Sequence, residues 1–294
     1  MAGLRMVCIP AYNEEGAIAD VVRRCGRFAD EVVVCDDGSG DGTAREARKA
    51  GATVIGYEKN AGKGRAMRML FDHAKKSGAD VVVTIDGDGQ FLPEEIPKLI
   101  GPVAAGRADV VLGYRYDSSE DAPSYRMLGN RVLDRMTKTA SGLPFRSSQG
   151  GFRAYSRRAI QQITFSTDGF GVDSEILISA SEKGLGIVEE GVTCLYNTGG
   201  KTSTKNPVVH MSGVMGFLLE SIAMRHPLRY IGIPGIALIV AGLFLGWYVL
   251  AVYDEIFYFS LPFTFASLAL LLVGILLMMV SVVLFSIMRV GARR

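Results

Sequence analysis

Residues 81–90 read Val81-Val82-Val83-Thr84-Ile85-Asp86-Gly87-Asp88-Gly89-Gln90. The run of β-branched residues is typical of a strand that is buried on both faces, as in a parallel sheet. Asp86 and Asp88 follow at the carboxyl end of that strand, where open α/β sheets bind their ligands. Two adjacent carboxylates repel each other, and a hard divalent cation such as Mg²⁺ or Mn²⁺ would relieve the repulsion. Taken alone, the stretch could also be a polar turn without a ligand.

Four other segments have the composition of strands, and helical segments separate them: residues 5–10, 31–35, 53–56 and 109–113. Strands that alternate with helices at this spacing predict βαβ units, and hence an α/β fold with a doubly wound, Rossmann-like and mostly parallel sheet. Asn13 is predicted to be the N-cap of the first helix, with Glu14 and Glu15 in its first turn. The polar turns after the first, second and fourth strands should line one crevice.

Spacing and composition argue against several kinds of binding site. A dinucleotide fingerprint needs G-x-G-x-x-G after the first strand, where this chain has Pro10-Ala11-Tyr12-Asn13. A phosphate-binding loop, G-x-x-x-x-G-K-[ST], fails at Gly62-Lys63 because Gly64 follows, and at Gly200-Lys201 because Leu195 stands at the first glycine position. The net charge of +2, without a strongly basic block, argues against nucleic acid as a partner. The four cysteines are scattered, which disfavours a zinc site or a disulfide framework.

Two long stretches towards the carboxyl terminus carry no charge, residues 230–253 and 256–288. A helix over the first stretch would span about 36 Å, enough for a hydrocarbon core of roughly 30 Å. We therefore predict two transmembrane helices, at about 230–253 and 260–288. Asp254 and Glu255 lie between them, and arginines flank the pair: Arg225, Arg229, Arg289, Arg293 and Arg294. The positive-inside rule then predicts a multi-pass membrane protein whose large amino-terminal part is cytoplasmic, in a prokaryotic cell membrane or the membrane of the endoplasmic reticulum.

The ends of the amino-terminal part complete the predicted organisation. Residues 1–5 run directly into the first strand without the pattern of a signal peptide. Residues 207–228 have a broad apolar face, which favours an amphipathic helix in the membrane interface. We expect a cytosolic catalytic domain at residues 1–206, an interfacial region at 207–228 and the two membrane helices within 229–294.

Four motifs occur in order along the chain: Pro10-Ala11-Tyr12-Asn13-Glu14, Asp36-Asp37-Gly38-Ser39-x-Asp41-Gly42-Thr43, Asn60-x-Gly62-Lys63-Gly64 and Asp86-x-Asp88-x-Gln90. With this combination the chain resembles the family 2 glycosyltransferases of the GT-A fold. More narrowly, it resembles the polyprenyl-phosphate (dolichyl-phosphate) glycosyltransferases, such as dolichol-phosphate mannose synthases. The resemblance covers about residues 5–205. It implies a membrane-bound, inverting enzyme that moves one hexose, mannose or glucose first, from a nucleotide sugar (GDP-mannose, UDP-glucose or UDP-GlcNAc) to dolichyl or polyprenyl phosphate.

The resemblance also implies roles on the donor side. Pro10, Tyr12 and Glu14 would border the base and ribose, and Asp37 would contact the nucleoside. Lys63 would lie beside the nucleotide. The metal on the diphosphate, Mg²⁺ or Mn²⁺, would be held by Asp86, Asp88 and Gln90. The alternative for Asp37 is a turn that caps the following helix.

On the acceptor side, the resemblance implies arginines after the fifth strand that hold the lipid phosphate. Arg115 matches, with Arg131 or Arg126 as its partner, and guanidinium groups suit phosphate oxygens. Asp88, Arg115 and Arg131 are the candidate catalytic residues. Residues 148–154, Ser-Gln-Gly-Gly-Phe-Arg-Ala, resemble the D-x-Q-S-G-F-R-A pattern of the family and make Arg153 a further candidate. Ser147 and Gly150 depart from that pattern, at its Asp and its Ser.

A phosphate acceptor is already ionised near neutral pH and needs no general base. If the acceptor were an alcohol, Asp173 or Glu175 could supply the base; otherwise they would cap a helix at residues 176–182 and face nearby arginines. Residues 196–205 are rich in glycine and basic, and we expect a loop that closes over the diphosphate with Lys201.

Two other functions stay open at this stage. The chain could be a family 2 enzyme that acts on a hydroxyl group of a glycolipid or polysaccharide, although the Q-x-x-R-W motif of processive synthases is absent. It could also be a membrane-anchored protein that binds nucleotide sugars without turnover. Association with membrane lipids is expected in every case, and homo-oligomerisation is left open.

Overall fold

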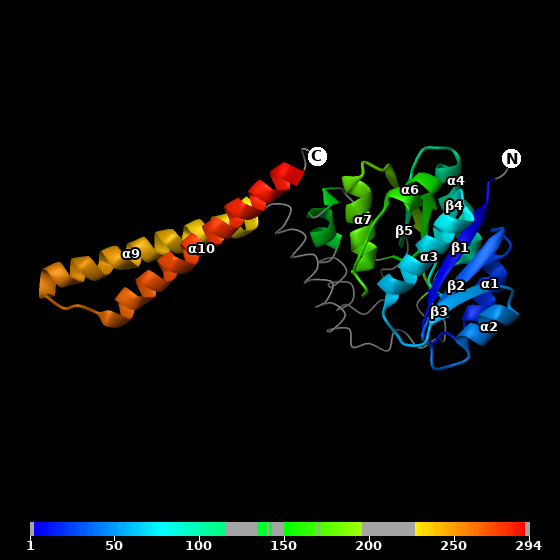
Figure 1. The fold of residues 1–294 in the computed structure, drawn as a ribbon, viewed down its shortest axis with the longest axis horizontal. Coiled ribbons are helices and arrows are strands. Elements are labelled where there is room, and N and C mark those ends of the chain that lie inside the picture. The colour runs from blue at the N-terminus through cyan, green and yellow to red at the C-terminus, as the bar shows by residue number, and fades with distance from the viewer. Residues whose placement is uncertain are drawn as a thin grey trace. The chain divides into compact units, whose positions relative to one another are not determined.

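The computed structural model describes residues 3–115, 134–139, 141–142, 150–169, 171–195 and 227–291. The chain divides into two compact units, residues 1–218 and residues 219–294. The first unit contains a sheet with helices on both faces, and the second contains two long helices (Figure 1).

The sheet has seven strands in the order β3-β2-β1-β4-β6-β5-β7. They are β1 (Arg5–Ala11), β2 (Glu31–Asp37), β3 (Thr53–Tyr57), β4 (Val81–Thr84), β5 (Val110–Arg115), β6 (Arg153–Ser156) and β7 (Ile187–Val192). Only β6 runs antiparallel to its neighbours, β4 and β5. The α/β class, the mostly parallel sheet and the five expected strands are confirmed, whereas β6 and β7 were not anticipated.

The register brings the ends of three strands to one edge. Ala11, the last residue of β1, pairs with Asp36 near the end of β2. Cys8 pairs with Thr84, the last residue of β4, and Asp86 follows two residues later. The polar turns after β1, β2 and β4 therefore share the carboxyl edge of the sheet, as the sequence predicted.

Two hydrophobic cores lie on the two faces of the sheet. One face is covered by α3 (Lys63–Ser77), α6 (Arg157–Gln162) and α7 (Val172–Glu182), which bury residues such as Leu70, Ile160 and Leu177. The other is covered by α1 (Ile18–Cys25), α2 (Thr43–Lys49) and α4 (Ile96–Ala104), with a single 3₁₀ turn at Pro93–Glu95 before α4. Because both faces are covered, β4 is buried along its whole length, Val81–Thr84, which explains its unbroken apolar sequence.

The predicted N-cap at Asn13 is wrong. Helix α1 begins at Ile18, and Ala17 occupies the N-cap position. Asn13 instead has a φ of 58°, in the left-handed region that asparagine tolerates better than most residues. Its side chain bonds to the loop after β2 rather than to a helix amide. The prediction failed because local capping propensity was overridden by a contact with a distant loop.

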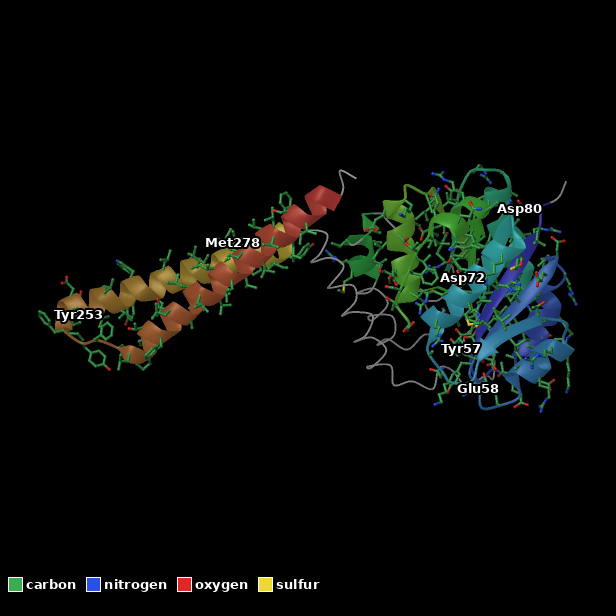
Figure 2. All side chains as sticks on the ribbon, viewed as in Figure 1. Tyr57, Glu58, Asp72, Asp80, Tyr253 and Met278 are labelled. Carbon is green, nitrogen blue, oxygen red and sulfur yellow. The ribbon has the colours of Figure 1, made fainter. Side chains whose placement is uncertain are left out.

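The second unit is a helical hairpin. A π-helical turn, Leu228–Gly232, leads into α9 (Ile233–Ile256), and α10 (Leu261–Gly291) returns alongside it. The segments Leu228–Ile256 and Leu261–Ile287 are long and apolar enough to cross a membrane, close to the two predicted spans. Most of their large apolar side chains are exposed, for example Trp247 and Leu272. Figure 2 shows these side chains projecting outwards along both helices, with Tyr253 near the carboxyl end of α9. The predicted interfacial helix at 207–228 lies almost wholly outside the described residues.

Candidate active site

The loops after β1 and β2 are joined by hydrogen bonds. Asn13 N–H donates to Ser39 Oγ and Asn13 Oδ1 accepts from Gly40 N–H, both at 2.9 Å. Glu14 N–H donates to Thr43 Oγ1 at 2.8 Å. The first two motifs therefore form one unit at the carboxyl edge of the sheet.

Asp37 joins the second motif to the third. It is 4% exposed, and its carboxylate accepts from Ala61 N–H at 2.8 Å, from Gly62 N–H at 3.0 Å and from Asn60 Nδ2 at 3.0 Å. The turn needs a glycine at position 62, where φ is 97°. Asp37 thus shapes the turn that precedes α3, and its predicted contact with a nucleoside stays a prediction.

Lys63, the first residue of α3, joins the third motif to the fourth. Its Nζ lies 3.0 Å from Asp86 Oδ1 and 3.1 Å from Asp173 Oδ2. Burial by itself lowers the pKa of Lys63, but Asp173 and Asp86 outweigh that effect and raise it above its ordinary value. The lysine is therefore charged, and it neutralises part of the negative charge of the site.

Asp86, Asp88 and Gln90 form a tight turn directly after β4. Asp88 Oδ1 accepts from Gln90 N–H at 2.9 Å, and Gly89 has a φ of 73°. The Asp86 side chain is 28% exposed and packs against Gly151. Sequence reasoning missed the role of Gly151; the signal was the second glycine of the Ser-Gln-Gly-Gly-Phe-Arg-Ala segment.

Negative charge gathers where these loops meet. The pKa of Glu14 is raised to about 7, first by burial and then by the carboxylates of Asp88, Asp86 and Asp41. Because the other carboxylates make ionisation of Glu14 unfavourable, the same site favours the binding of a cation. Among the residues that the structure describes, no three His, Cys, Asp or Glu side chains are grouped as a metal site. Two carboxylates completed by substrate phosphates are, however, a usual arrangement for Mg²⁺, so Asp86 and Asp88 fit a divalent cation that arrives with a diphosphate.

Asp173 and Glu175 lie in the first turn of α7, which begins at Val172, four residues earlier than expected. Asp173 is 5% exposed and contacts Lys63 and Arg153. Arg153 is 2% exposed, and it donates to Gly150 O at 2.8 Å and to Asp173 O at 2.9 Å. Glu175 accepts from Ser166 N–H and Thr167 N–H. The structure therefore connects Arg153 and Asp173 to the site, whereas Glu175 binds the neighbouring loop.

The remaining predicted site residues are placed only in part. Pro10 lies near the end of β1 and is half-buried, and Tyr12 is 36% exposed in the following loop. Arg115 ends β5 opposite Val192, but its side chain is outside the description. Arg126, Arg131 and Lys201 also fall outside the described residues. The acceptor side of the site stays a prediction.

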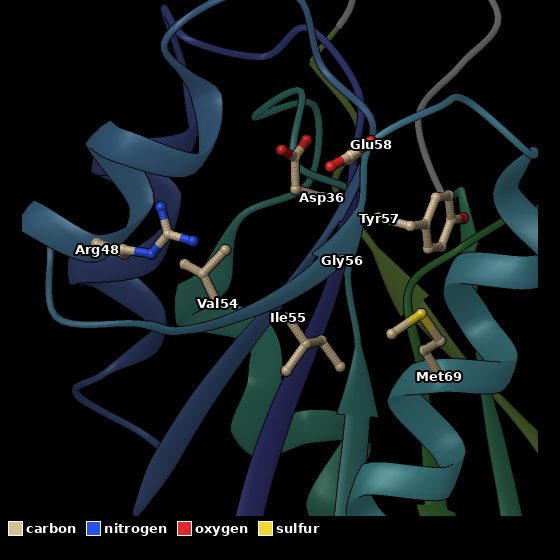
Figure 3. Close-up of a pocket in the computed structure, with 8 residues that line it drawn as sticks. All are labelled: Asp36, Arg48, Val54, Ile55, Gly56, Tyr57, Glu58 and Met69. Carbon is tan, nitrogen blue, oxygen red and sulfur yellow. The ribbon is translucent and has the colours of Figure 1, made fainter.

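An open groove of about 550 Å³ lies elsewhere, at the β3 edge of the sheet (Figure 3). Val54 and Arg48 line it on one side of the strand, and Ile55, Tyr57 and Met69 line it on the other. It includes none of Lys63, Asp86 and Asp88. Asp36 of the second motif also lines the groove, with Arg48 and Glu58. We predict that the active site lies at the turns around Lys63 and Asp86, because the contacts of Lys63 with Asp86 and Asp173 join the third and fourth motifs there.

Known proteins give an independent comparison. The family described as "Glycosyl transferase family 2" matches residues 6–164. The chain is 32% identical over 250 residues to glycosyltransferase AglJ of Haloferax volcanii, across 83% of this chain and 80% of that protein. It is 34% identical over 186 residues to a dolichyl-phosphate hexose transferase of the same organism, across 62% of this chain and 79% of that protein.

Among solved structures, the chain is similar to glucosyl-3-phosphoglycerate synthase from Mycobacterium tuberculosis, in complex with Mn²⁺, UDP-glucose and phosphoglyceric acid. The TM-score is 0.61 at 23% identity, across 76% of this chain and 80% of that one. At this identity the likeness concerns the fold alone, and it confirms the fold predicted from the motifs.

Proposed function

The chain belongs to glycosyltransferase family 2, and from this premise we propose that it transfers one hexose from a nucleotide sugar to dolichyl or polyprenyl phosphate at a membrane. Mannose and glucose are the leading sugars, carried by GDP or UDP. The relative named a dolichyl-phosphate hexose transferase supports the acceptor class. The catalytic domain would be cytoplasmic, anchored by α9 and α10.

One observation carries the proposal. The loops after β1 and β2 are joined by hydrogen bonds, and the carboxylates of Asp86 and Asp88, after β4, act on the carboxyl group of Glu14. Asp86 also contacts the ammonium group of Lys63. A nucleoside diphosphate with its metal has the charge pattern that such a site complements: a cation for the carboxylates and phosphates for the lysine.

The leaving diphosphate gains negative charge as the glycosidic bond breaks. Mg²⁺ or Mn²⁺, held by Asp86, Asp88 and Gln90, would supply Lewis-acid stabilisation of that charge. Lys63 adds a fixed positive charge in a partly buried site, where electrostatic interactions are stronger than in water. Both charges come from groups that are in place before the reaction begins.

The acceptor phosphate needs orientation rather than deprotonation. Arg115, with Arg126 or Arg131, would bind its oxygens and direct one of them at the anomeric carbon, opposite the diphosphate, so that the configuration inverts. No proton acceptor is required, because the phosphate oxygen is already ionised. Asp173 and Glu175 are bound to other groups in the structure, which agrees with this chemistry.

The test uses the full-length protein in detergent or nanodiscs with dolichyl phosphate. GDP-mannose, UDP-glucose and UDP-GlcNAc are supplied separately with Mg²⁺ or Mn²⁺, and the lipid products are analysed by mass spectrometry. We expect one donor to yield a glycosyl phospholipid, and we expect a chelator or Asp88→Ala to stop the reaction. Failure to form a glycosyl lipid with any of the donors would refute the proposal.

A further inference from the structure

The first turn of α7 reaches the Asn60–Gly64 turn by two separate routes. Asp173 contacts the side chain of Lys63. Glu175 accepts from Ser166 and Thr167, and Thr167 and Asp168 pack on the backbone of Gly62 and Gly64. We infer that Asp173 and Glu175 are positioning residues that hold this turn, and with it Lys63, against Asp86. The inference rests on the proposed function for the identity of the nucleotide substrate.

The first route runs through buried charges. Asp173 Oδ2 is 3.1 Å from Lys63 Nζ, and Asp173 Oδ1 is 3.8 Å from Arg153 Nη2. Arg153 is itself fixed by its bonds to Gly150 O and Asp173 O. Because the lysine has a carboxylate on each side, Asp173 determines how far its ammonium group lies from Asp86.

The second route runs through a loop. The carboxylate of Glu175 accepts from Ser166 N–H at 2.8 Å and from Thr167 N–H at 2.9 Å. The same loop supplies Asp168 O, which accepts from Gly64 N–H at 2.8 Å. Arg68 on α3 donates to Ser166 O at 2.7 Å and closes the connection.

Glycine is required where this loop meets the third motif. A Cβ atom at Gly62 would collide with Asp168 O, and one at Gly64 would collide with Thr167 O. The backbone of the turn therefore lies directly on residues 167–168. Asp173 and Lys63 are 110 residues apart, so the sequence alone does not associate them.

The alternative role for Asp173 is a general base, and the contacts distinguish the two. A base needs a free lone pair within reach of the acceptor proton. Asp173 is 5% exposed, and its two oxygens face Lys63 and Arg153. We therefore assign Asp173 the role of positioning Lys63 and not that of accepting a proton.

A double-mutant cycle on the full-length protein tests the assignment. Asp173→Asn, Lys63→Met and the double variant are compared by calorimetric binding of GDP and UDP with Mn²⁺. We expect Asp173→Asn to weaken nucleotide binding about tenfold, as expected for the loss of a hydrogen-bonded charge pair. The double variant should bind the nucleotide no more weakly than Lys63→Met does, since the two substitutions remove the same interaction.

Kinetics on the same variants separate positioning from proton transfer. We expect Asp173→Asn to raise the KM for the donor, to leave the KM for the lipid phosphate unchanged and to retain the acidic limb of the pH–rate profile. Glu175→Gln should change the donor KM in the same direction, but less. Glu182→Gln, exposed at the other end of α7, is the matched control.

Three outcomes would overturn the inference. The first is unchanged nucleotide binding together with a fall in kcat of more than about a hundredfold and loss of the acidic limb, which would make Asp173 a base. The second is a double variant whose fold loss of nucleotide affinity equals the product of the fold losses of the two single variants. The third is an equal loss of donor and acceptor binding with a lowered melting temperature, which would indicate general destabilisation. The binding cycle does not involve the acceptor, so it remains decisive even if no glycosyl lipid forms.

Discussion

Gly151 lies directly against the carboxylate of Asp86. A Cβ atom built on Gly151 would come within 2.6 Å of Asp86 Cγ, so no other residue leaves this carboxylate in its place. Thr84 Oγ1 donates to Gly151 O at 2.8 Å and fixes the backbone of Gly151 beside the end of β4. The antiparallel strand β6 begins two residues later, and its pairing with β4 explains why these distant segments meet.

Gly151→Ala should displace Asp86 and lower kcat/KM by about 10- to 100-fold, the range in which a misplaced catalytic group acts. Protein yield and melting temperature should change little, because the methyl group would displace the end of the partly exposed Asp86 side chain rather than core residues. Steady-state kinetics with the donor varied is the measurement. Gly150→Ala is the matched control, since among the described residues its Cβ would meet Gly113 O, at 3.2 Å, and not Asp86. Equal activity of the two variants would contradict the prediction.

Asp37→Ala should destabilise the protein and weaken donor binding together. The substitution leaves the amides of Ala61 and Gly62 without their carboxylate, at a cost of about 2–4 kcal/mol for buried groups of this kind. Thermal unfolding and nucleotide binding measure the two effects. Asp36→Ala is the comparison, because the Asp36 carboxylate accepts from Ser39 in its own loop, so that its loss should perturb the Asn60–Gly62 turn much less. A stable Asp37→Ala protein with weak nucleotide binding would instead favour direct contact with the nucleoside.

The sequence predicted the strands of the βαβ region because each is a short apolar run followed by a polar turn. It did not predict β6 and β7. The β6 sequence, Arg153–Ser156, has only four residues and includes a buried arginine, and β7 is mostly half-buried and contains Glu189 and Glu190. Neither strand has the alternation or the continuous apolar run on which the other assignments rest.

Some features of the candidate site were likewise predictable from the sequence, and others were not. The four motifs were predictable because each lies at the end of a local element. The contacts of Lys63 with Asp173, and of Gly151 with Asp86, were not, since they depend on tertiary packing between segments that are distant in the sequence. At Asn13 the sequence predicted a contact that does not form. Asn13 has a local propensity to cap a helix, but it forms hydrogen bonds with Ser39 and Gly40 instead.

The raised pKa of Glu14 predicts a change of stability with pH. Its folded-state pKa is about 7 and its ordinary value is 4.5, so between these pH values the folded protein retains a proton that the unfolded chain has lost. The free energy of unfolding should therefore fall as pH rises from 4.5 to 7, by less than the full pKa difference implies because Glu14 is partly exposed to solvent, and the effect should level off above that range. Glu14→Gln should remove this fall. Melting temperatures of both proteins, measured without divalent cations from pH 4.5 to 8, test the prediction, and parallel pH curves would contradict it.

The helical hairpin depends on close contact between α9 and α10. A Cβ atom on Gly274 would come within 2.7 Å of Ile239 Cγ1 and 2.8 Å of Gly235 O, and Ser267 Oγ donates to Gly242 O at 2.7 Å. Small residues that let two backbones approach are the usual basis of helix packing in membranes. Gly274→Leu should therefore force the helices apart and cost about 1–3 kcal/mol, as overpacking typically does.

Trp247, the only tryptophan of the chain, lies on α9 and reports on this packing. Its fluorescence, followed during titration of the detergent-solubilised protein with SDS, should show an earlier transition for Gly274→Leu than for the wild type. Val273→Leu is the matched control, because Val273 is the preceding residue and its side chain is 45% exposed on the outer surface of the hairpin. The control should unfold like the wild type, since it adds one methylene group where lipid would surround it. If both variants unfolded at the same SDS concentration, the two helices would not pack through the Gly235–Gly274 face.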